Sequence, residues 1–239
     1  FPDFPAEIRA PIGTPYGVSA FQINFGSGVI MTAGDAPDAL VALNPAALIV
    51  NIEEIKPGGL VIVDSGSFSE KNVQKAGYDK NPLEDGSLEK YRVFPIDISR
   101  LTLEAVSDTE VNKRDGLRCK NMWTLGLISW MYDRDLGPTI AYLEGKFAKK
   151  LPEVAKANVA ALKAGHAFGE TAEMPDDVRG FTIKPADFAP GVYRTVTGTE
   201  ATSWGLVAGA QLAGLKIALC SYPITPASGI LHVLSRLKA

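Results

Sequence analysis

Short apolar runs separated by turns predict a parallel sheet near the start of the chain. Residues 38–43 form a run of strand length, residues 46–55 read as a helix, and 60–63 are a second apolar run closed by Asp64. Asn44, followed by a proline, supplies the helix N-cap, and a Pro-Gly-Gly turn ends the helix. A strand–helix–strand unit of this length implies parallel strands.

Flanking segments extend this pattern. Residues 91–98 alternate like another strand, and Pro95 places that strand at a sheet edge because proline donates no backbone hydrogen bond. Residues 16–30 combine aromatic residues, β-branched residues and glycines, which is typical of strands and turns. Residues 71–88 are rich in turn dipeptides and are predicted to be rich in loops.

Helical periodicity dominates the middle of the chain. Residues 120–132 are apolar on most sides and predict a buried helix, and helices beginning with proline follow at 138–150 and 152–165. His166 is then expected to be a cation at a helix C-terminus. The three tryptophans lie on apolar helices and are predicted to be core residues: Trp123, Trp130 and Trp204.

The periodicity breaks at residues 170–197, which are rich in proline, glycine and aspartate and read as an interdomain linker. A helix is predicted at 198–213, where Gly205 and Gly209 favour a tight contact with a sheet over a ligand role. A strand is predicted at 215–220 and a helix at 226–237, in which His232 is interpreted as solvated or packed. The fold class is therefore α/β.

The composition is that of an ordinary globular protein. The 239 residues are 46% hydrophobic and 21% charged, with a formal net charge of −3, which excludes extensive disorder and makes nucleic acid a poor partner. No apolar run approaches the roughly 18 residues of a membrane span, and the first residues lack a secretory signal pattern. We expect a cytoplasmic protein with neither a nucleic-acid nor a membrane partner.

Cysteine and histidine are too scarce for most metal chemistry. The two cysteines cannot hold an iron–sulfur cluster, which needs four thiolates. A structural zinc would require both cysteines and both histidines to converge, so no metal site is predicted on this chain. Cys119 lies between two basic residues that could lower its pKa, but no base is near in sequence and we interpret it as structural.

The segment 221–226 is the strongest candidate for a functional site. It follows the predicted strand and ends in Pro226, so Thr225 is the natural N-cap of the next helix. A helix N-terminus beyond the carboxyl end of a strand can receive an anion such as a carboxylate through free N–H groups and a hydroxyl. The alternative is that Thr225 only caps its own helix, and spacing alone favours this alternative.

The sequence resembles the 2-oxoacid:ferredoxin oxidoreductases, in particular the alpha subunit of the 2-oxoglutarate type. In that subunit a gamma domain is fused ahead of a pyrimidine-binding domain. The most specific element is the Tyr-Pro-Ile-Thr-Pro run at 222–226. The further matching motifs are Glu7-Ile8-Arg9-Ala10-Pro11, Phe21-Gln22-Ile23-Asn24, Asn44-Pro45-Ala46-Ala47, Asn81-Pro82-Leu83-Glu84, Arg118-Cys119-Lys120-Asn121 and Thr197-Gly198-Thr199-Glu200-Ala201.

This resemblance implies thiamine-dependent oxidative decarboxylation of a 2-oxoacid, with coenzyme A as cosubstrate and ferredoxin as electron acceptor. It implies that Thr225 contacts the substrate carboxylate beside the thiamine. Thiamine diphosphate with its Mg²⁺, and a 4Fe-4S cluster, are expected mainly on a beta subunit, in an αβ pair or a dimer of such pairs. The pocket wall is expected to contain Ser221, Tyr222, Pro223, Ile224 and Thr225.

The resemblance also divides the chain. Residues 1–169 are expected to be a Rossmann-like gamma domain that is incomplete at its N-terminus, 170–197 a linker, and 198–239 the truncated start of a thiamine-diphosphate-binding, pyrimidine-type α/β domain. We expect that such a fragment would not catalyse the reaction on its own. Arg9 is a candidate for pairing with a phosphate of coenzyme A, although a surface ion pair is favoured.

Two other functions stay open. One is a non-catalytic, Rossmann-like subunit that binds a nucleotide or coenzyme A. In that case removal of the Thr225 hydroxyl should leave the decarboxylation activity of the full complex intact. The other is a transketolase-like transfer enzyme, which would be a homodimer without iron.

Overall fold

The computed structural model describes residues 2–3, 11–28, 30, 32–147, 151–172, 178, 181–194, 196–222, 224 and 228–237. Among these residues the chain divides into two compact units, with the division between Ala186 and Asp187. The first unit contains a parallel sheet with its helices, and the second contains the helices α8 and α9. None of the described helices is both long enough and apolar enough to cross a membrane.

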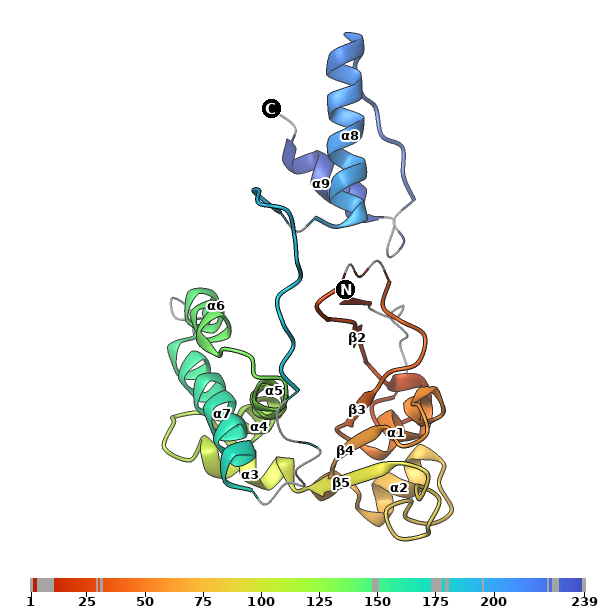
Figure 1. Cartoon of the computed structure of the whole chain (residues 1–239), viewed down its shortest axis with the longest axis vertical. Helices are drawn as coiled ribbons and strands as arrows, with labels where there is room; N and C mark the ends of the chain where they lie inside the picture. The colour runs from red at the N-terminus through yellow and green to blue at the C-terminus, as the bar shows by residue number, and fades with distance from the viewer. Residues whose placement is uncertain are drawn as a thin grey trace. The chain divides into compact units, whose positions relative to one another are not determined.

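Three parallel strands form the sheet of the first unit, in the order β3-β4-β5 (Figure 1). They are β3 (Ala39–Ala42), β4 (Leu60–Asp64) and β5 (Arg92–Ile96). The helix α1 (Pro45–Asn51) connects β3 to β4, which confirms the predicted strand–helix–strand unit. As predicted, β5 lies at an edge of the described sheet.

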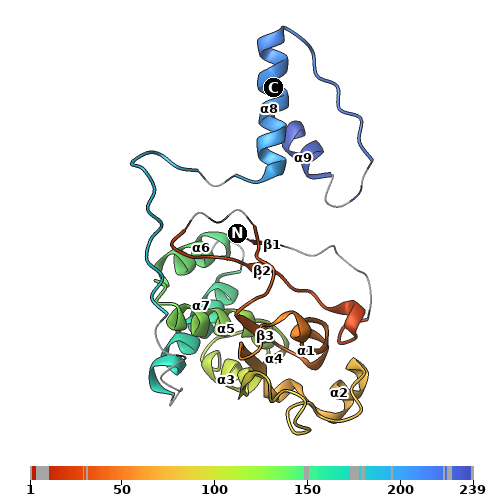
Figure 2. The same ribbon diagram turned by 45° about the vertical axis from the view of Figure 1, so that its right-hand side comes forward.

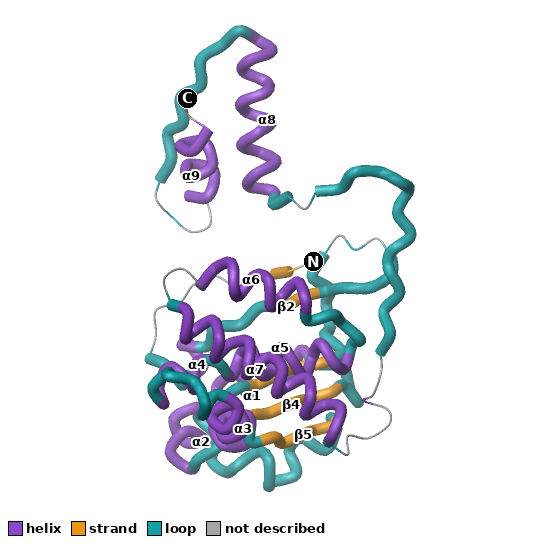
Figure 3. Tube along the Cα trace, turned by 90° about the vertical axis from the view of Figure 1, so that its left-hand side faces the viewer, coloured by secondary structure: helices purple, strands orange, loops and turns teal. Residues whose placement is uncertain are grey.

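Side chains of β4 alternate between two cores because successive residues of a strand point to opposite faces. Leu60 and Ile62 belong to one core cluster, while Val61 and Val63 belong to the other. The helices α1 and α2 cover one face, and α3, α5 and α7 lie on the other (Figures 1 and 3). The bounds of these covering helices are α2 (Glu70–Ala76), α3 (Ile98–Ala105), α5 (Lys120–Met131) and α7 (Pro152–Thr171).

Several smaller elements complete the first unit. The segment 16–30 is less regular than predicted, with one short strand that pairs antiparallel with β1. The segment 71–88 is rich in loops, as predicted, except for its first residues, which belong to α2; this helix ends at a left-handed C-cap, Gly77, at φ 95°. The remaining elements are β1 (Pro2–Asp3), β2 (Gln22–Ile23), α4 (Lys113–Arg118), α6 (Gly137–Phe147) and the 3₁₀ turns Pro15–Gly17, Ile52–Glu54 and Ser65–Ser67.

Glycines allow α5 and α7 to cross at close range. A Cβ on Gly165 would overlap the carbonyl oxygen of Trp123, and one on Gly126 would overlap a backbone carbonyl of α7. The prediction that the helix ends at Gly165 is therefore wrong, because this glycine serves helix packing and α7 continues to Thr171. His166 consequently lies inside α7, with its Nδ1 3.6 Å from Glu170 Oε1, and is not a C-terminal residue.

The tryptophans differ in burial. Trp123 is 1% exposed in the core cluster that contains Leu60 and Ile62, as predicted, and Trp130 packs against the same cluster. Trp204 is only half-buried in the second unit, where the Arg194 guanidinium lies 4.9 Å from its ring centroid.

The second unit is a pair of helices lying side by side, α8 (Gly198–Ala213) and α9 (Ser228–Leu237) (Figure 2). The predicted strand at 215–220 is wrong for this structure: all six residues are exposed and none is in a strand. A strand needs a neighbouring strand to pair its backbone groups, and no strand is found among the described residues of this unit. The predicted tight contact is also missing, since a Cβ on Gly205 or Gly209 would meet no described atom within 4 Å.

Candidate functional site

The three parallel strands of the first unit end at one edge of their sheet, and the loops that leave this edge carry polar residues. The Asn44 side chain follows β3 and accepts a hydrogen bond from Ala47 N at 2.8 Å, which confirms its role as an N-cap. Asp97 follows β5 and caps α3 by accepting from Arg100 N at 3.0 Å. Asp64 ends β4 between them. In open α/β sheets this edge is where ligands bind.

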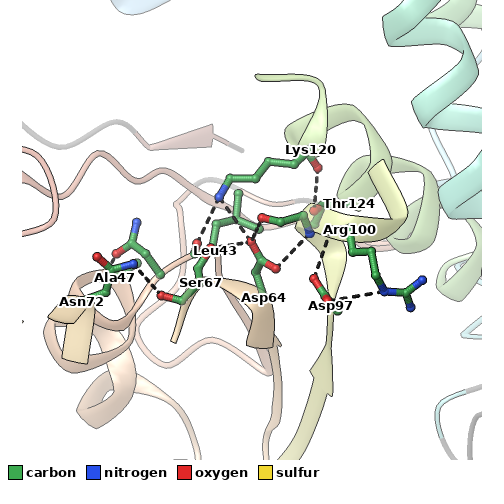
Figure 4. A network of polar contacts seen from close by, with 11 residues as sticks. Leu43, Ala47, Asp64, Ser67, Asn72, Asp97, Arg100, Lys120 and Thr124 are labelled. Carbon is green, nitrogen blue, oxygen red and sulfur yellow. Dashed lines mark hydrogen bonds and ion pairs between the residues drawn. The ribbon is translucent and has the colours of Figure 1, made fainter. Parts of the chain in front are cut away.

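Asp64 is the centre of this edge (Figure 4). Its side chain is fully buried, and Oδ1 accepts a hydrogen bond from Ser99 N at 3.0 Å. Its Oδ2 accepts from the hydroxyls of Ser99 at 2.6 Å and Ser67 at 2.7 Å. The Lys120 ammonium, 3.3 Å from the same oxygen, also donates to the Leu43 carbonyl at 3.3 Å.

These contacts satisfy the carboxylate from within the protein. A buried charge is tolerated when it is paired and hydrogen-bonded, and Asp64 has a cation and three further donors. The donors come from α3, α5 and the turn after β4, so the cluster ties these segments to the sheet. Its chemistry is that of an anchor, because each donor is already directed at a protein atom.

The apolar run at 60–63 predicts Asp64 at the end of a strand but indicates no role for this residue. The available signal was a carboxylate directly after four buried apolar residues. Its partners Ser99 and Lys120 lie 35 and 56 residues later in the chain. No local spacing could have brought them together.

The predicted pocket residues fall in the second unit or outside the description. Ser221, Tyr222 and Ile224 are exposed, and the structure places them next to one another, with Ile224 N donating to the Tyr222 carbonyl at 2.9 Å. Tyr222 is 76% exposed and Ile224 56% exposed. The remaining predicted site residues lie outside the described residues: Arg9, Pro223 and Thr225.

The helix that follows the pocket segment begins at Ser228, and the predicted start at Pro226 lies outside the described residues. Ser228 N donates to the Ile224 carbonyl at 3.0 Å, and the Ser228 hydroxyl donates to the same carbonyl at 3.2 Å. These two bonds link α9 directly to the pocket segment. His232, on the same helix, is exposed, in agreement with the interpretation of a solvated side chain.

The cysteines do not form a metal centre in the described part of the chain. Cys119 is buried and Cys220 exposed, and no group of three potential ligands converges among the described residues. Burial, and secondarily the negative charge of Asp115, raise the pKa of the Cys119 thiol. The basic neighbours in sequence therefore do not activate it, and the structural interpretation agrees with its environment.

Comparisons with known proteins agree with the sequence motifs. A family model for pyruvate ferredoxin/flavodoxin oxidoreductase matches residues 1–168. The 2-oxoglutarate oxidoreductase subunit KorA of Mycobacterium tuberculosis is 52% identical over 237 residues, which are 99% of this chain and 36% of that protein.

A solved structure gives a second match. The 2-oxoglutarate:ferredoxin oxidoreductase from Magnetococcus marinus, with 2-oxoglutarate, coenzyme A and succinyl-CoA bound, is 26% identical with a TM-score of 0.60. The match covers 86% of this chain and 31% of that one, so the chain spans about a third of the length of the relatives it matches. Because the family model covers most of its residues, the chain belongs to the pyruvate ferredoxin/flavodoxin oxidoreductase family.

Proposed function

We propose that this chain is part of the alpha subunit of a 2-oxoglutarate:ferredoxin oxidoreductase, which oxidatively decarboxylates 2-oxoglutarate to an acyl-CoA and reduces ferredoxin. The observation that carries the proposal is the 52% identity to a 2-oxoglutarate oxidoreductase subunit over 99% of the chain. The Magnetococcus marinus enzyme, which binds 2-oxoglutarate and coenzyme A, supports the same substrate class.

The chain's residues do not fit the redox cofactors of such an enzyme. A 4Fe-4S cluster needs four thiolates, whereas this sequence has two cysteines, one of them buried beside Asp115. No metal-ligand group suited to the Mg²⁺ of thiamine diphosphate is found among the described residues. We therefore assign thiamine diphosphate and the cluster mainly to a beta subunit, in an αβ pair or a dimer of such pairs.

The chain's own contribution is proposed to be the substrate-facing wall formed by residues 221–225. Thr225 would contact the carboxylate of the 2-oxoacid, with Tyr222 and Ile224 beside it. Apolar and aromatic side chains that are exposed in this chain, such as Tyr222 at 76%, are suited to line a pocket that is closed by other parts of the enzyme. The domain division at 1–169, 170–197 and 198–239 is part of the same proposal.

The role of Thr225 is testable in the complete enzyme. Thr225→Ala should lower kcat with 2-oxoglutarate by about a hundredfold, because it removes a hydroxyl donor from a charged group. Thr225→Ser should restore most of the activity. Thr225→Asp keeps a good helix N-cap but places a negative charge beside the substrate carboxylate, so it should be as inactive as Thr225→Ala. Full activity of Thr225→Asp would show that this residue only caps a helix and would favour the non-catalytic alternative.

Iron analysis separates the proposal from thiamine chemistry without ferredoxin. The purified native complex should contain iron and acid-labile sulfide although this chain has only two cysteines. A homodimer without iron would contradict the ferredoxin assignment and favour a transketolase-like enzyme.

A further inference from the structure

In the second unit, the first turn of α8 contacts the first turn of α9. A Cβ on Gly229, in the first turn of α9, would lie 2.9 Å from the Cγ2 methyl of Thr199, in the first turn of α8. Real Cβ atoms essentially never approach another carbon so closely. Glycine at 229 is therefore the residue that lets the two helices meet at this distance.

The Thr199 side of this contact is held in place. Thr197 and Glu200 form a reciprocal capping box, with Thr197 N donating to the Glu200 carboxylate at 3.0 Å. The fully buried Ser203 hydroxyl donates to the Thr199 carbonyl at 2.7 Å. Threonine is also β-branched, so its χ1 has few alternatives within a helix. A larger residue at position 229 would therefore displace α9 more readily than α8.

The Gly229 side is connected to the pocket segment. Ser228, its neighbour, donates from both its backbone N and its hydroxyl to the Ile224 carbonyl, and Ile224 N donates to the Tyr222 carbonyl. A displacement of the first turn of α9 is thus transmitted through hydrogen bonds to Ile224 and Tyr222.

We infer that Thr199 and Gly229 are positioning residues, whose close contact sets the placement of Tyr222 and Ile224 toward the 2-oxoacid. This inference rests on the proposed function of that segment. Neither residue is proposed to contact the reacting atoms. Their effect is on geometry, and errors of about 1 Å in the placement of substrate-binding groups can reduce rates by up to about a hundredfold.

The test is Gly229→Ala in the complete enzyme, with the compensating change Thr199→Ser. Gly229→Ala should raise KM for 2-oxoglutarate about tenfold while leaving KM for coenzyme A unchanged. Thr199→Ser removes the methyl group that the new Cβ would meet, so the double variant should recover most of the wild-type KM. The single Thr199→Ser variant closes the double-mutant cycle.

Several results would overturn the inference. These are an unchanged KM in Gly229→Ala, an equal rise in both KM values, or no recovery in the double variant. If Gly229→Ala does not assemble, Thr199→Ile tests the same contact by adding bulk from the α8 side, with the same expected rise for 2-oxoglutarate alone. Gly145→Ala is the matched control, because a Cβ on Gly145 would meet no described atom within 4 Å.

The inference and the proposed function fail in different ways. If the wild-type complex does not oxidise 2-oxoglutarate, the function is wrong whatever the variants do. If the wild type is active and Thr225→Ala is not, but Gly229→Ala matches the wild type, only the positioning role is wrong.

Discussion

Asp64 shows how single residues are stabilised in this fold. The carboxylate is fully buried, yet it receives hydrogen bonds on both oxygens and faces the Lys120 ammonium, whose side chain is 25% exposed. Leaving such a charge without its partner would cost several kcal/mol, whereas the complete cluster offsets the loss of hydration. The described pocket residues Ser221, Tyr222 and Ile224 differ from Asp64 in burial: their side chains are exposed, whereas the Asp64 side chain is fully buried among its partners.

The burial of Cys119 predicts the reactivity of its thiol. Burial raises the pKa of its thiol, so iodoacetamide at pH 8 should modify exposed Cys220 of the native chain and leave Cys119 unmodified until urea is added. Because the folded-state pKa exceeds that of the unfolded chain, the thiol contributes stability that is complete below about pH 8.5 and is lost as pH rises through the folded-state pKa. Peptide mass mapping measures the modification, and equal labelling of both cysteines in the native chain would contradict the prediction.

At the scale of elements, the crossing of α5 and α7 depends on glycine. Gly165→Ala would force a Cβ into the Trp123 carbonyl, which is part of a helix backbone and cannot rotate away. The variant should lose at least about 2 kcal/mol of unfolding free energy, measured by urea denaturation. Gly145→Ala in α6 is the matched control and should be neutral or gain up to about 1 kcal/mol, since it only reduces backbone freedom. Equal stability of the two variants would show that the helices can separate without cost.

The elements also show what the sequence could and could not predict. The strand–helix–strand unit followed from apolar runs and a proline after Asn44, because local signals determine those boundaries. The end of α7 could not be predicted in this way. A glycine after a periodic stretch looks like a C-cap, and only the position of Trp123 on another helix shows that Gly165 lies in a contact.

For the whole molecule, the two units differ in how far local sequence signals predict their elements. The first unit has a sheet with cores on both faces, so its elements could be read from periodicity. The segment 215–220 has the composition of a buried strand, but no described strand of the second unit can pair with it. The motif at 222–226 resembles the family, but the relatives are about three times as long as this chain, so no spacing rule within it could define the whole of the proposed pocket.

Hydrogen exchange tests this interpretation of the second unit. In the 239-residue chain the amides of residues 216–222 should exchange rapidly, because this exposed segment lies outside every described strand and helix. In a complete enzyme of the relatives' length, the same amides should become protected if 215–220 is a strand of a pyrimidine-binding domain. Val61 and Val63 of β4 are the internal reference, since they are fully buried in a paired strand and should be protected in both proteins. Rapid exchange of 216–222 in both would contradict the strand and the domain proposed for residues 198–239.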